Sequence, residues 1–253
     1  MNELNISRFP PLSYACAEAV NALCTNLSFS GDGIRKIMIT SSHSGEGKSY
    51  LAMNIMRTMA RLGKVVALVD ADLRRSTLSS RYGFRFRDSD QKPGLAHYLA
   101  GRAAAKDVIY RTNLEGAFLV PLGREVSNPL PLLNTQRFDR LLDELARQAD
   151  YVLVDVPPVG MVIDAAQIAK FCDGTLVVVN YNSVHRQELI EVRKQLEQTG
   201  CPILGAVLNR VDYDSNLSKR YDYKSRDVDD SCRGRAPRPE RHRGRKRGGS
   251  GGT

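Results

Sequence analysis

The sequence lacks several features that mark whole classes of protein. It has no tryptophan, and aromatic residues make up only 7% of its 253 residues. Its five cysteines are widely separated, without the short spacing of a zinc site or a redox motif. No apolar run approaches the roughly 18 residues of a membrane-spanning helix, and the first residues lack the basic and apolar regions of a secretory signal. We therefore expect a soluble, cytoplasmic protein without a disulfide framework.

The formal charge of +9 is concentrated at the C-terminal end. Residues 233–253 hold seven arginines, one lysine and one glutamate, a balance of +7, so the rest of the chain is nearly neutral. Residues 225–253 contain almost no apolar side chains and cannot offset the entropy lost on ordering, which predicts a disordered basic tail. The last 21 residues include no aromatic side chain that could stack on bases, so no specific nucleic acid is expected. Attraction to an anionic membrane surface is the alternative to a simply solvated tail.

Apolar, β-branched runs alternate with segments of helical periodicity. This alternation predicts an α/β fold with a mostly parallel sheet and helices on both faces. The expected strands are residues 36–40, 65–69, 117–121, 151–156, 175–180 and 203–209. The expected helices are residues 12–27, 48–61, 135–148, 163–171 and 184–198. The polar, aperiodic stretch 79–92 is expected to form a surface loop.

A glycine-rich segment, SHSGEGKS, joins the first of these strands to the helix that follows it. It fits the phosphate-binding pattern G-x-x-x-x-G-K-[ST], except that Ser42 replaces the leading glycine. Gly45 and Gly47 would let backbone N–H groups surround a β-phosphate at the helix N-terminus. Lys48 can reach the β- and γ-phosphate oxygens, and the Ser49 hydroxyl can bind Mg²⁺. The position between strand and helix favours nucleotide binding over a glycine-rich turn.

Three aspartates follow two of the expected strands. Asp70 and Asp72 come after strand 65–69, and Asp155 lies near the end of strand 151–156. In a parallel sheet these carboxylates emerge at the same edge as the phosphate loop. Asp155 would hold Mg²⁺ through water, and Asp70 or Asp72 could accept a proton from an attacking hydroxyl. A single aspartate after a strand is usually a helix cap, but three beside a phosphate loop predict a catalytic cluster.

With these motifs in place, the sequence resembles the bacterial tyrosine kinases (BY-kinases) of capsule and exopolysaccharide export. The resemblance rests on the phosphate loop, on VVALVDADLR ending at Arg74, and on YVLVDVPP at 151–158. The D-x-D-x-R element is the most specific, because ordinary P-loop ATPases lack it. Further segments with the same similarity are GLAHYLAG at 94–101, LGREVSNPLPLL at 122–133 and GAVLNRVD at 205–212.

The resemblance implies a P-loop NTPase fold, ATP and Mg²⁺ as cofactors, and ATP-dependent autophosphorylation on tyrosine. The nucleotide-binding residues that it implies are Gly45, Glu46, Gly47, Lys48, Ser49, Tyr50 and Asn209, the last of these against the adenine ring. The implied metal ligands are Ser49, Asp72 and Asp155. The implied catalytic residues are Lys48, Asp70, Asp72 and Asp155, with Asp70 as the candidate base.

The same resemblance divides the chain and supplies its acceptors and partners. It implies an N-terminal helical segment (1–30), a P-loop kinase domain (31–212) and a tail (213–253). Three of the ten tyrosines fall within eleven residues of this tail and are the expected phosphoacceptors, namely Tyr213, Tyr221 and Tyr223. The expected partner is a membrane-anchored adaptor of the polysaccharide co-polymerase type, which would place the kinase at the inner face of the plasma membrane.

One family feature is incomplete in this chain. BY-kinases carry Glu-x-x-Arg-x-x-Arg on the N-terminal helix, which joins neighbouring subunits of a ring. Here the register reads Glu18, Asn21 and Cys24, and neither Asn nor Cys can make the bidentate ionic contacts of a guanidinium. The pattern thus leaves the homo-oligomeric state open.

Two other functions remain as alternatives. A positioning ATPase of the Min or Par type would share the fold, but such proteins carry a lysine at the second position of the phosphate loop, where this chain has His43. A nucleotide-binding regulatory subunit without kinase activity would fit the missing ring arginines. The reaction product separates the readings, because an ATPase releases inorganic phosphate and the kinase forms phosphotyrosine.

Overall fold

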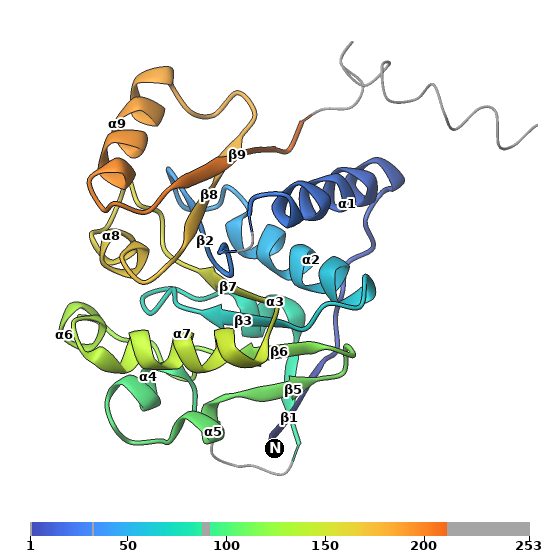
Figure 1. The fold of residues 1–253 in the computed structure, drawn as a ribbon, viewed down its shortest axis with the longest axis vertical. Coiled ribbons are helices and arrows are strands. Elements are labelled where there is room, and N and C mark those ends of the chain that lie inside the picture. The colour runs from blue at the N-terminus through green and yellow to red at the C-terminus, as the bar shows by residue number, and fades with distance from the viewer. Residues whose placement is uncertain (1, 32, 88–91, 212–253) are drawn as a thin grey trace, which may run out of the picture. The chain divides into compact units, whose positions relative to one another are not determined.

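The structure, a computed structural model, describes residues 2–31, 33–87 and 92–211. Its strands are β1 (Asn2–Ile6), β2 (Lys36–Ser41), β3 (Val66–Asp70), β4 (Phe84–Phe86), β5 (Tyr110–Thr112), β6 (Ala117–Val120), β7 (Tyr151–Asp155), β8 (Gly174–Asn180) and β9 (Ile203–Asn209). Within the described ranges they form one sheet of nine strands, in the order β4-β1-β5-β6-β3-β7-β2-β8-β9 (Figure 1). Six of its eight pairings are parallel, and β1–β4 and β5–β6 are antiparallel.

Helices cover both faces of this sheet. They are α1 (Tyr14–Ser28), α2 (Lys48–Arg61), α3 (Leu78–Tyr82), α4 (Leu95–Leu99), α5 (Ala105–Val108), α6 (Leu130–Leu133), α7 (Gln136–Gln148), α8 (Asp164–Ala169) and α9 (Arg186–Glu197). Side chains of α1, α2 and α3 pack on one face, and those of α4, α7, α8 and α9 pack on the other. Among the described helices none has the length and apolar character needed to cross a bilayer. The expected α/β fold with a mostly parallel sheet is confirmed.

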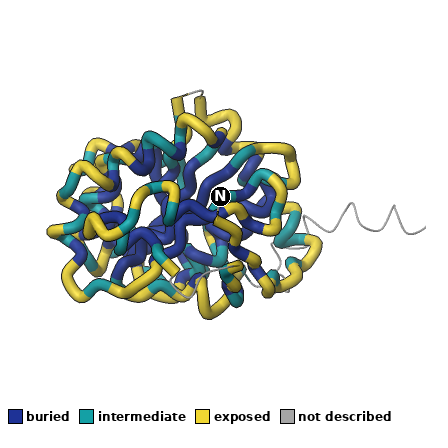
Figure 2. Tube along the Cα trace, turned by 90° about the horizontal axis from the view of Figure 1, so that it is seen from below, coloured by how far each residue is buried: buried dark blue, intermediate teal, exposed yellow. Residues whose placement is uncertain are grey.

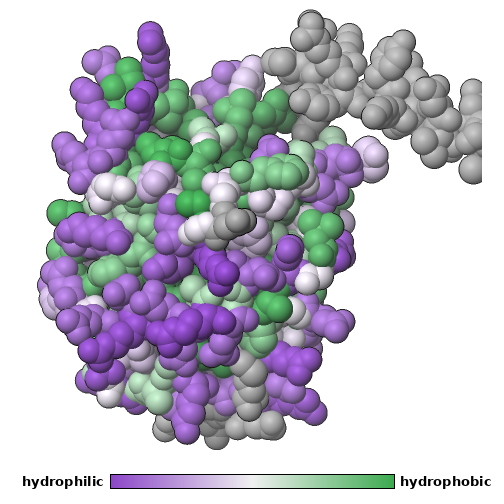
Figure 3. All heavy atoms as spheres, viewed as in Figure 1, coloured by the Kyte–Doolittle hydropathy of each residue, from purple (hydrophilic) through white to green (hydrophobic). Residues whose placement is uncertain are grey.

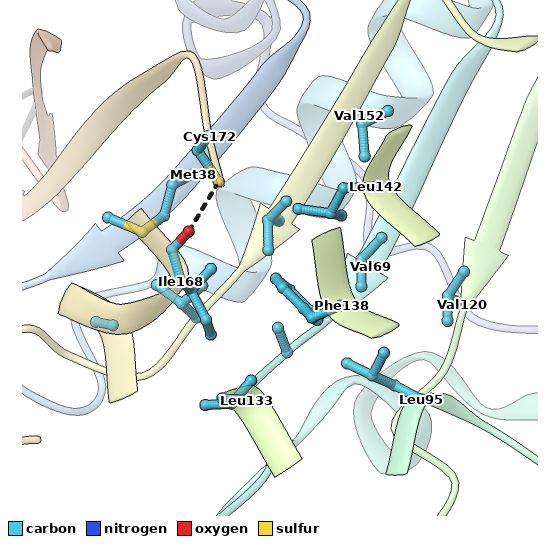
Figure 4. Close-up of a cluster of buried hydrophobic side chains, with 14 of the residues drawn as sticks. Met38, Val69, Leu95, Val120, Leu133, Phe138, Leu142, Val152, Ile168 and Cys172 are labelled. Carbon is cyan, nitrogen blue, oxygen red and sulfur yellow. Dashed lines mark hydrogen bonds between the residues drawn. The ribbon is translucent and has the colours of Figure 1, made fainter. Parts of the chain in front are cut away.

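Helix α7 shows how the sequence pattern produces this packing. Its buried residues Phe138, Leu141, Leu142 and Leu145 recur at the spacing of one helical face, while charged residues occupy the other face. Phe138 and Leu142 lie beside Val69 of β3 in the buried cluster of Figure 4. Figure 2 shows the same division for the backbone, with buried segments at the centre and exposed segments around them.

The cluster extends to α8, where the Cys172 thiol donates a hydrogen bond to the Ile168 carbonyl (Figure 4). Burial raises the pKa of Cys172 well above its usual value, so the thiol stays protonated. Cys16, Cys24 and Cys201 are also free thiols. The face seen in Figure 3 is largely hydrophilic, with smaller apolar areas between the polar side chains.

The strands predicted in the second half of the chain and at the phosphate loop are present within one residue of the expected ends. The prediction of a surface loop over residues 79–92 is wrong in its first part, because α3 and β4 occupy residues 78–86. Gly83 joins these two short elements in a left-handed conformation with φ 59°, and Tyr82 and Phe84 beside it are buried. Arginines at 81, 85 and 87 alternate with these apolar residues, so the segment has the composition of a polar loop.

Strand β1 was also not predicted. Leu4 and Ile6 point into the core, while Glu3 and Asn5 point outward, the two-residue alternation of a half-buried strand. β1 lies between β4 and β5, two other short strands that the sequence did not indicate. The predicted helix over residues 12–27 follows it as α1. The tail and its three tyrosines lie outside the described residues.

Candidate functional site

The phosphate loop lies between β2 and α2, and its glycines have left-handed backbone angles. Gly45 has φ 84° and Gly47 has φ 97°, backbone angles that residues other than glycine rarely adopt. A Cβ atom at Gly47 would lie only 2.1 Å from Asn209 Nδ2. Glycine is therefore favoured at position 47 by the backbone conformation, and any larger residue would also have to displace the Asn209 side chain.

Glu46 ties this loop to the ends of β8 and β9. Its buried carboxylate accepts hydrogen bonds from the backbone N–H of His43 at 2.8 Å and from that of Asn180 at 3.3 Å. The Asn209 side-chain amide donates to the Glu46 carbonyl at 2.8 Å. The sequence placed Glu46 and Asn209 at the nucleotide, and the structure places them against each other. Asn180 was not singled out, because an asparagine at a strand end resembles any turn former.

The three aspartates and Lys48 meet at the adjoining strand ends. Asp70 of β3 and Asp155 of β7 are direct partners in the register of two neighbouring parallel strands. Lys48 Nζ lies 3.0 Å from Asp72 Oδ2 and 3.9 Å from Asp155 Oδ1. Asp70, Asp72 and Asp155 are 1%, 5% and 1% exposed, respectively. The structure thus brings together the four residues that the sequence assigned to catalysis.

Burial and mutual repulsion control the electrostatics of this cluster. Burial, together with the charges of Asp155 and Asp72, raises the pKa of Asp70 to about 8, although Ser76 and Lys48 oppose the rise. Burial also raises the pKa of Asp155, against the effects of Lys48 and of a hydrogen bond from Ser49. For Lys48 burial acts to lower the pKa, but Asp155 and Asp72 outweigh it and raise the pKa above its usual value.

Ser76 is a site residue that the sequence analysis missed. Its hydroxyl donates a hydrogen bond to Asp70 Oδ2 and accepts one from the Leu78 backbone N–H. Asp70 is thereby held by one carboxylate oxygen. Ser76 lies two residues beyond the D-x-D-x-R element, where one serine among several polar residues gave no signal.

The residues present fit Mg²⁺ and a nucleotide. Within the described ranges five buried side-chain oxygens have no hydrogen-bond partner, and four of them belong to residues of this site: Ser42 Oγ, Asp70 Oδ1, Asp155 Oδ1 and Asn180 Oδ1. No set of three or more His, Cys, Asp or Glu side chains in the described part of the chain is arranged as a metal site by itself. Mg²⁺ needs no such set beside a nucleotide, because it is bound through one or two carboxylates and the substrate phosphates. Ser49, Asp72 and Asp155 would supply the protein ligands.

The remaining predicted residues occupy varied positions. Tyr50 follows Ser49 in the first turn of α2, and its carbonyl accepts a hydrogen bond from Asn54. On α1, the exposed Asn21 donates to Glu18 at 3.2 Å, whereas Cys24 is only 3% exposed. Burial raises the pKa of this thiol to about 12. The third position of the expected ring motif therefore faces the core.

Comparison with known proteins places this geometry in a family. The model of the CobQ/CobB/MinD/ParA nucleotide binding domain matches residues 37–228. The chain is 39% identical over 195 residues to the Tyrosine-protein kinase CpsD of Streptococcus pneumoniae. The match covers 77% of this chain and 84% of the relative. The chain belongs to the CpsD-type bacterial tyrosine kinases. It is also 36% identical to CpsD of Streptococcus agalactiae serotype III (strain NEM316), over 77% of this chain and 82% of the relative.

Solved structures agree with this membership. The kinase domain of the Escherichia coli tyrosine kinase ETK matches with a TM-score of 0.69 and 29% identity, covering 78% of this chain and 77% of that one. The septum site-determining protein MinD of Pyrococcus horikoshii OT3, complexed with Mg-ADP, matches with a TM-score of 0.61 and 26% identity, over 72% of each chain. The expectation of a bacterial tyrosine kinase on a P-loop fold is thereby confirmed for this CpsD-type chain, and so is that of a nucleotide-binding domain.

Proposed function

We propose that this CpsD-type kinase transfers the γ-phosphoryl group of ATP to Tyr213, Tyr221 or Tyr223, and that this autophosphorylation regulates capsular or exopolysaccharide assembly. The observation that carries the proposal is the position of Lys48 between Asp72 and Asp155, at the start of α2 and beside the phosphate loop. An amine held by two carboxylates at this point can exchange those contacts for phosphate oxygens.

Each residue of the cluster has a distinct part in this proposal. Lys48 neutralises charge that develops on the transferred group, and Asn209 contacts the adenine ring. Ser49, Asp72 and Asp155 would hold Mg²⁺, which would supply positive charge to the phosphate groups. The unpartnered Oδ1 atoms of Asp70 and Asp155 support their assignments as base and ligand, and the resemblance to the BY-kinases supplies those of Ser49 and Asp72.

Asp70 acts as the base. Its Oδ1 accepts the proton of the tyrosine hydroxyl as that hydroxyl oxygen bonds to the γ-phosphorus. The bond from this phosphorus to the β,γ-bridging oxygen breaks, and ADP leaves. A carboxylate with a pKa near 8 is a suitable base for this step at neutral pH, because general acid-base catalysis is most efficient when the pKa of the catalytic group lies close to the working pH.

The proposal includes a membrane-anchored adaptor of the polysaccharide co-polymerase type, which holds the kinase at the inner face of the plasma membrane. The basic end of the chain, with a balance of +7 over residues 233–253, would add attraction to anionic lipid headgroups. Phosphorylation adds about −1.5 to −2 charges per tyrosine and would weaken that attraction.

Phosphosite mass spectrometry of the full chain, with and without the adaptor, tests the proposal. We expect phosphate on Tyr213, Tyr221 or Tyr223 in the wild type and none in a Lys48→Met variant. Unmodified tyrosines in the presence of adaptor, together with continued release of inorganic phosphate from ATP, would overturn it in favour of a positioning ATPase.

A further inference from the structure

The arginine of the D-x-D-x-R element has no part in the chemistry described above, yet it makes a strong ion pair. Arg74 Nε lies 2.5 Å from Asp164 Oδ2, and Arg74 also donates through a terminal nitrogen to Asp164 Oδ1 at 3.1 Å. Two parallel hydrogen bonds of this kind fix the relative orientation of both side chains. Asp164, in the first turn of α8, is 1% exposed, and the Arg74 side chain is 34% exposed.

Arg74 connects the aspartate segment to a second loop as well. It donates to the Ser127 carbonyl at 3.4 Å, and the neighbouring Val126 N–H donates to the Leu73 carbonyl at 2.8 Å. Asp72 is anchored next to this point, because its Oδ1 accepts from the Arg75 N–H at 3.1 Å. Asp72 therefore lies in a segment that is attached to β7 through the Ala71 N–H, which donates to the Asp155 carbonyl at 2.8 Å, and to the loop at Val126 and Ser127 through Leu73 and Arg74.

The partner of Arg74 is attached to the phosphate loop. The chain between β7 and Asp164 packs on the end of β2, where Val159 N–H donates to the Ser41 carbonyl at 3.0 Å. Thr40 Oγ1 donates to the Pro157 carbonyl at 3.0 Å. A Cβ atom on Gly160 would lie 2.7 Å from the Ser42 carbonyl oxygen, so the two backbones are in direct contact. The ion pair thus closes a connection from Asp72 through α8 back to the phosphate loop.

We propose that Arg74 and Asp164 form a positioning pair that sets the location of Asp72 relative to the phosphate loop, and through it the rate of phosphoryl transfer. The inference rests on the proposed function, since it assigns these two residues to the same reaction. Neither residue contacts the reacting atoms. Loss of the pair therefore slows the chemical step. It leaves the affinity for ADP in the absence of Mg²⁺ largely intact, because the loop glycines and Lys48 are unchanged and Asp72 acts on the nucleotide through Mg²⁺.

The test compares Arg74→Met, Arg74→Lys, Asp164→Asn and the double variant Arg74→Met/Asp164→Asn in the full chain with its adaptor. We expect Arg74→Met and Asp164→Asn each to lower kcat for tyrosine phosphorylation by about tenfold or more, with Kd for ADP measured without Mg²⁺ changed less than about threefold. The double variant should be no slower than the slower single variant, since both changes remove one interaction. Arg74→Lys keeps the charge but loses the paired hydrogen bonds, so it should lie in between.

Arg193→Met is the matched control. Arg193 pairs with Glu197 at 2.7 Å on the exposed side of α9, and its loss should leave kcat unchanged. Equal kcat in wild type and all Arg74 and Asp164 variants would overturn the inference. So would multiplicative losses in the double variant, or a fall in kcat matched by an equal loss of affinity for ADP without Mg²⁺ or of folded protein. Asp164→Asn preserves the side-chain shape and keeps the test valid if Arg74→Met does not fold.

Failure of the proposed function is seen separately. If the wild type forms no phosphotyrosine, the same variants are measured by release of inorganic phosphate from ATP. A slower release, with unchanged binding of ADP in the absence of Mg²⁺, in Arg74→Met and Asp164→Asn would support the positioning pair without tyrosine transfer. Unchanged release would overturn it.

Discussion

The β4-β1-β5 edge and the β3-β7 centre of the sheet use charged side chains in opposite ways. At the edge, Glu3 and Arg87 form an ion pair with side chains that are 51% and 73% exposed, above an apolar inner face. At the centre, Asp70 and Asp155 are buried side by side next to Lys48. Exposed charges cost little to place, whereas buried like charges oppose folding. The charges at the edge therefore cost little free energy of folding, whereas the buried carboxylates at the centre lower the stability of the fold at the position where catalysis is proposed.

The largest effect on activity is expected from a substitution in the charged cluster at the centre of the sheet. Lys48→Met should lower the rate of tyrosine phosphorylation by about 100- to 1,000-fold, because it removes the positive charge aimed at the transferred group. It should also destabilise the nucleotide-free protein, since Asp72 and Asp155 lose their partner. Radiolabel transfer and thermal melting measure the two effects. A variant with normal transfer would contradict the role of the cluster.

Asp70→Asn should separate activity from stability. It removes the candidate base, so transfer should fall by about 100-fold or more. The folded-state pKa of Asp70, about 8, lies above its ordinary value of 3.8, so the folded state binds more protons than the unfolded state between these values. The free energy of unfolding that this group contributes therefore decreases as pH rises from about 4 to about 8.

Asparagine does not ionise, so Asp70→Asn should melt higher than the wild type at pH 8 and close to it at pH 4. Melting curves at the two values, with an exposed Glu115→Gln variant as control, provide the measurement. Equal melting temperatures of Asp70→Asn and wild type at pH 8 would show that the carboxylate carries no such penalty.

A change at the edge should have the reverse effect. Leu4 is 1% exposed on the inner face of β1, and Leu4→Ala should lower the free energy of unfolding by about 2–5 kcal/mol. The rate of transfer by the protein that remains folded should stay at the wild-type value. Denaturant unfolding and kinetics at a temperature well below melting measure both quantities. Reduced kcat in fully folded Leu4→Ala would mean that the edge and the site are coupled.

The smallest effect concerns an exposed pair on α9. Arg193 and Glu197 lie one helical turn apart at 2.7 Å, with side chains 71% and 50% exposed. Such pairs contribute about 0.3–0.5 kcal/mol, so Glu197→Gln should change the free energy of unfolding by no more than that. Repeating the unfolding measurement in high salt should reduce the difference further. A loss above 1 kcal/mol, roughly the upper limit for exposed pairs, would place this charge with the buried ones.

The centre could be predicted from the sequence because its signals are local and continuous. β3 and β7 are apolar runs followed at once by aspartate, and Gly45, Gly47 and Lys48 lie within four residues of one another. Parallel pairing brings these strand ends to the same edge as the phosphate loop, so a cluster of the three aspartates beside Lys48 could be predicted. The edge could not be predicted, because β1, β4 and β5 have three to five residues each, too few to establish a period. Ser76 contacts Asp70 from a position that no motif marks. Asp164 contacts Arg74 from a segment that is distant in the sequence.

The direct pairing of Asp70 with Asp155 has a consequence for refolding. Successive residues of a strand point to opposite faces, so a shift of β3 by one residue against β7 would turn Asp70 to the other side of the sheet. A misregistered chain could regain its helices and much of its compactness and still lack the cluster. Recovery of enzymatic activity after denaturation is therefore a reporter of strand register, and it should lag behind recovery of the circular dichroism signal whenever slipped pairings form first.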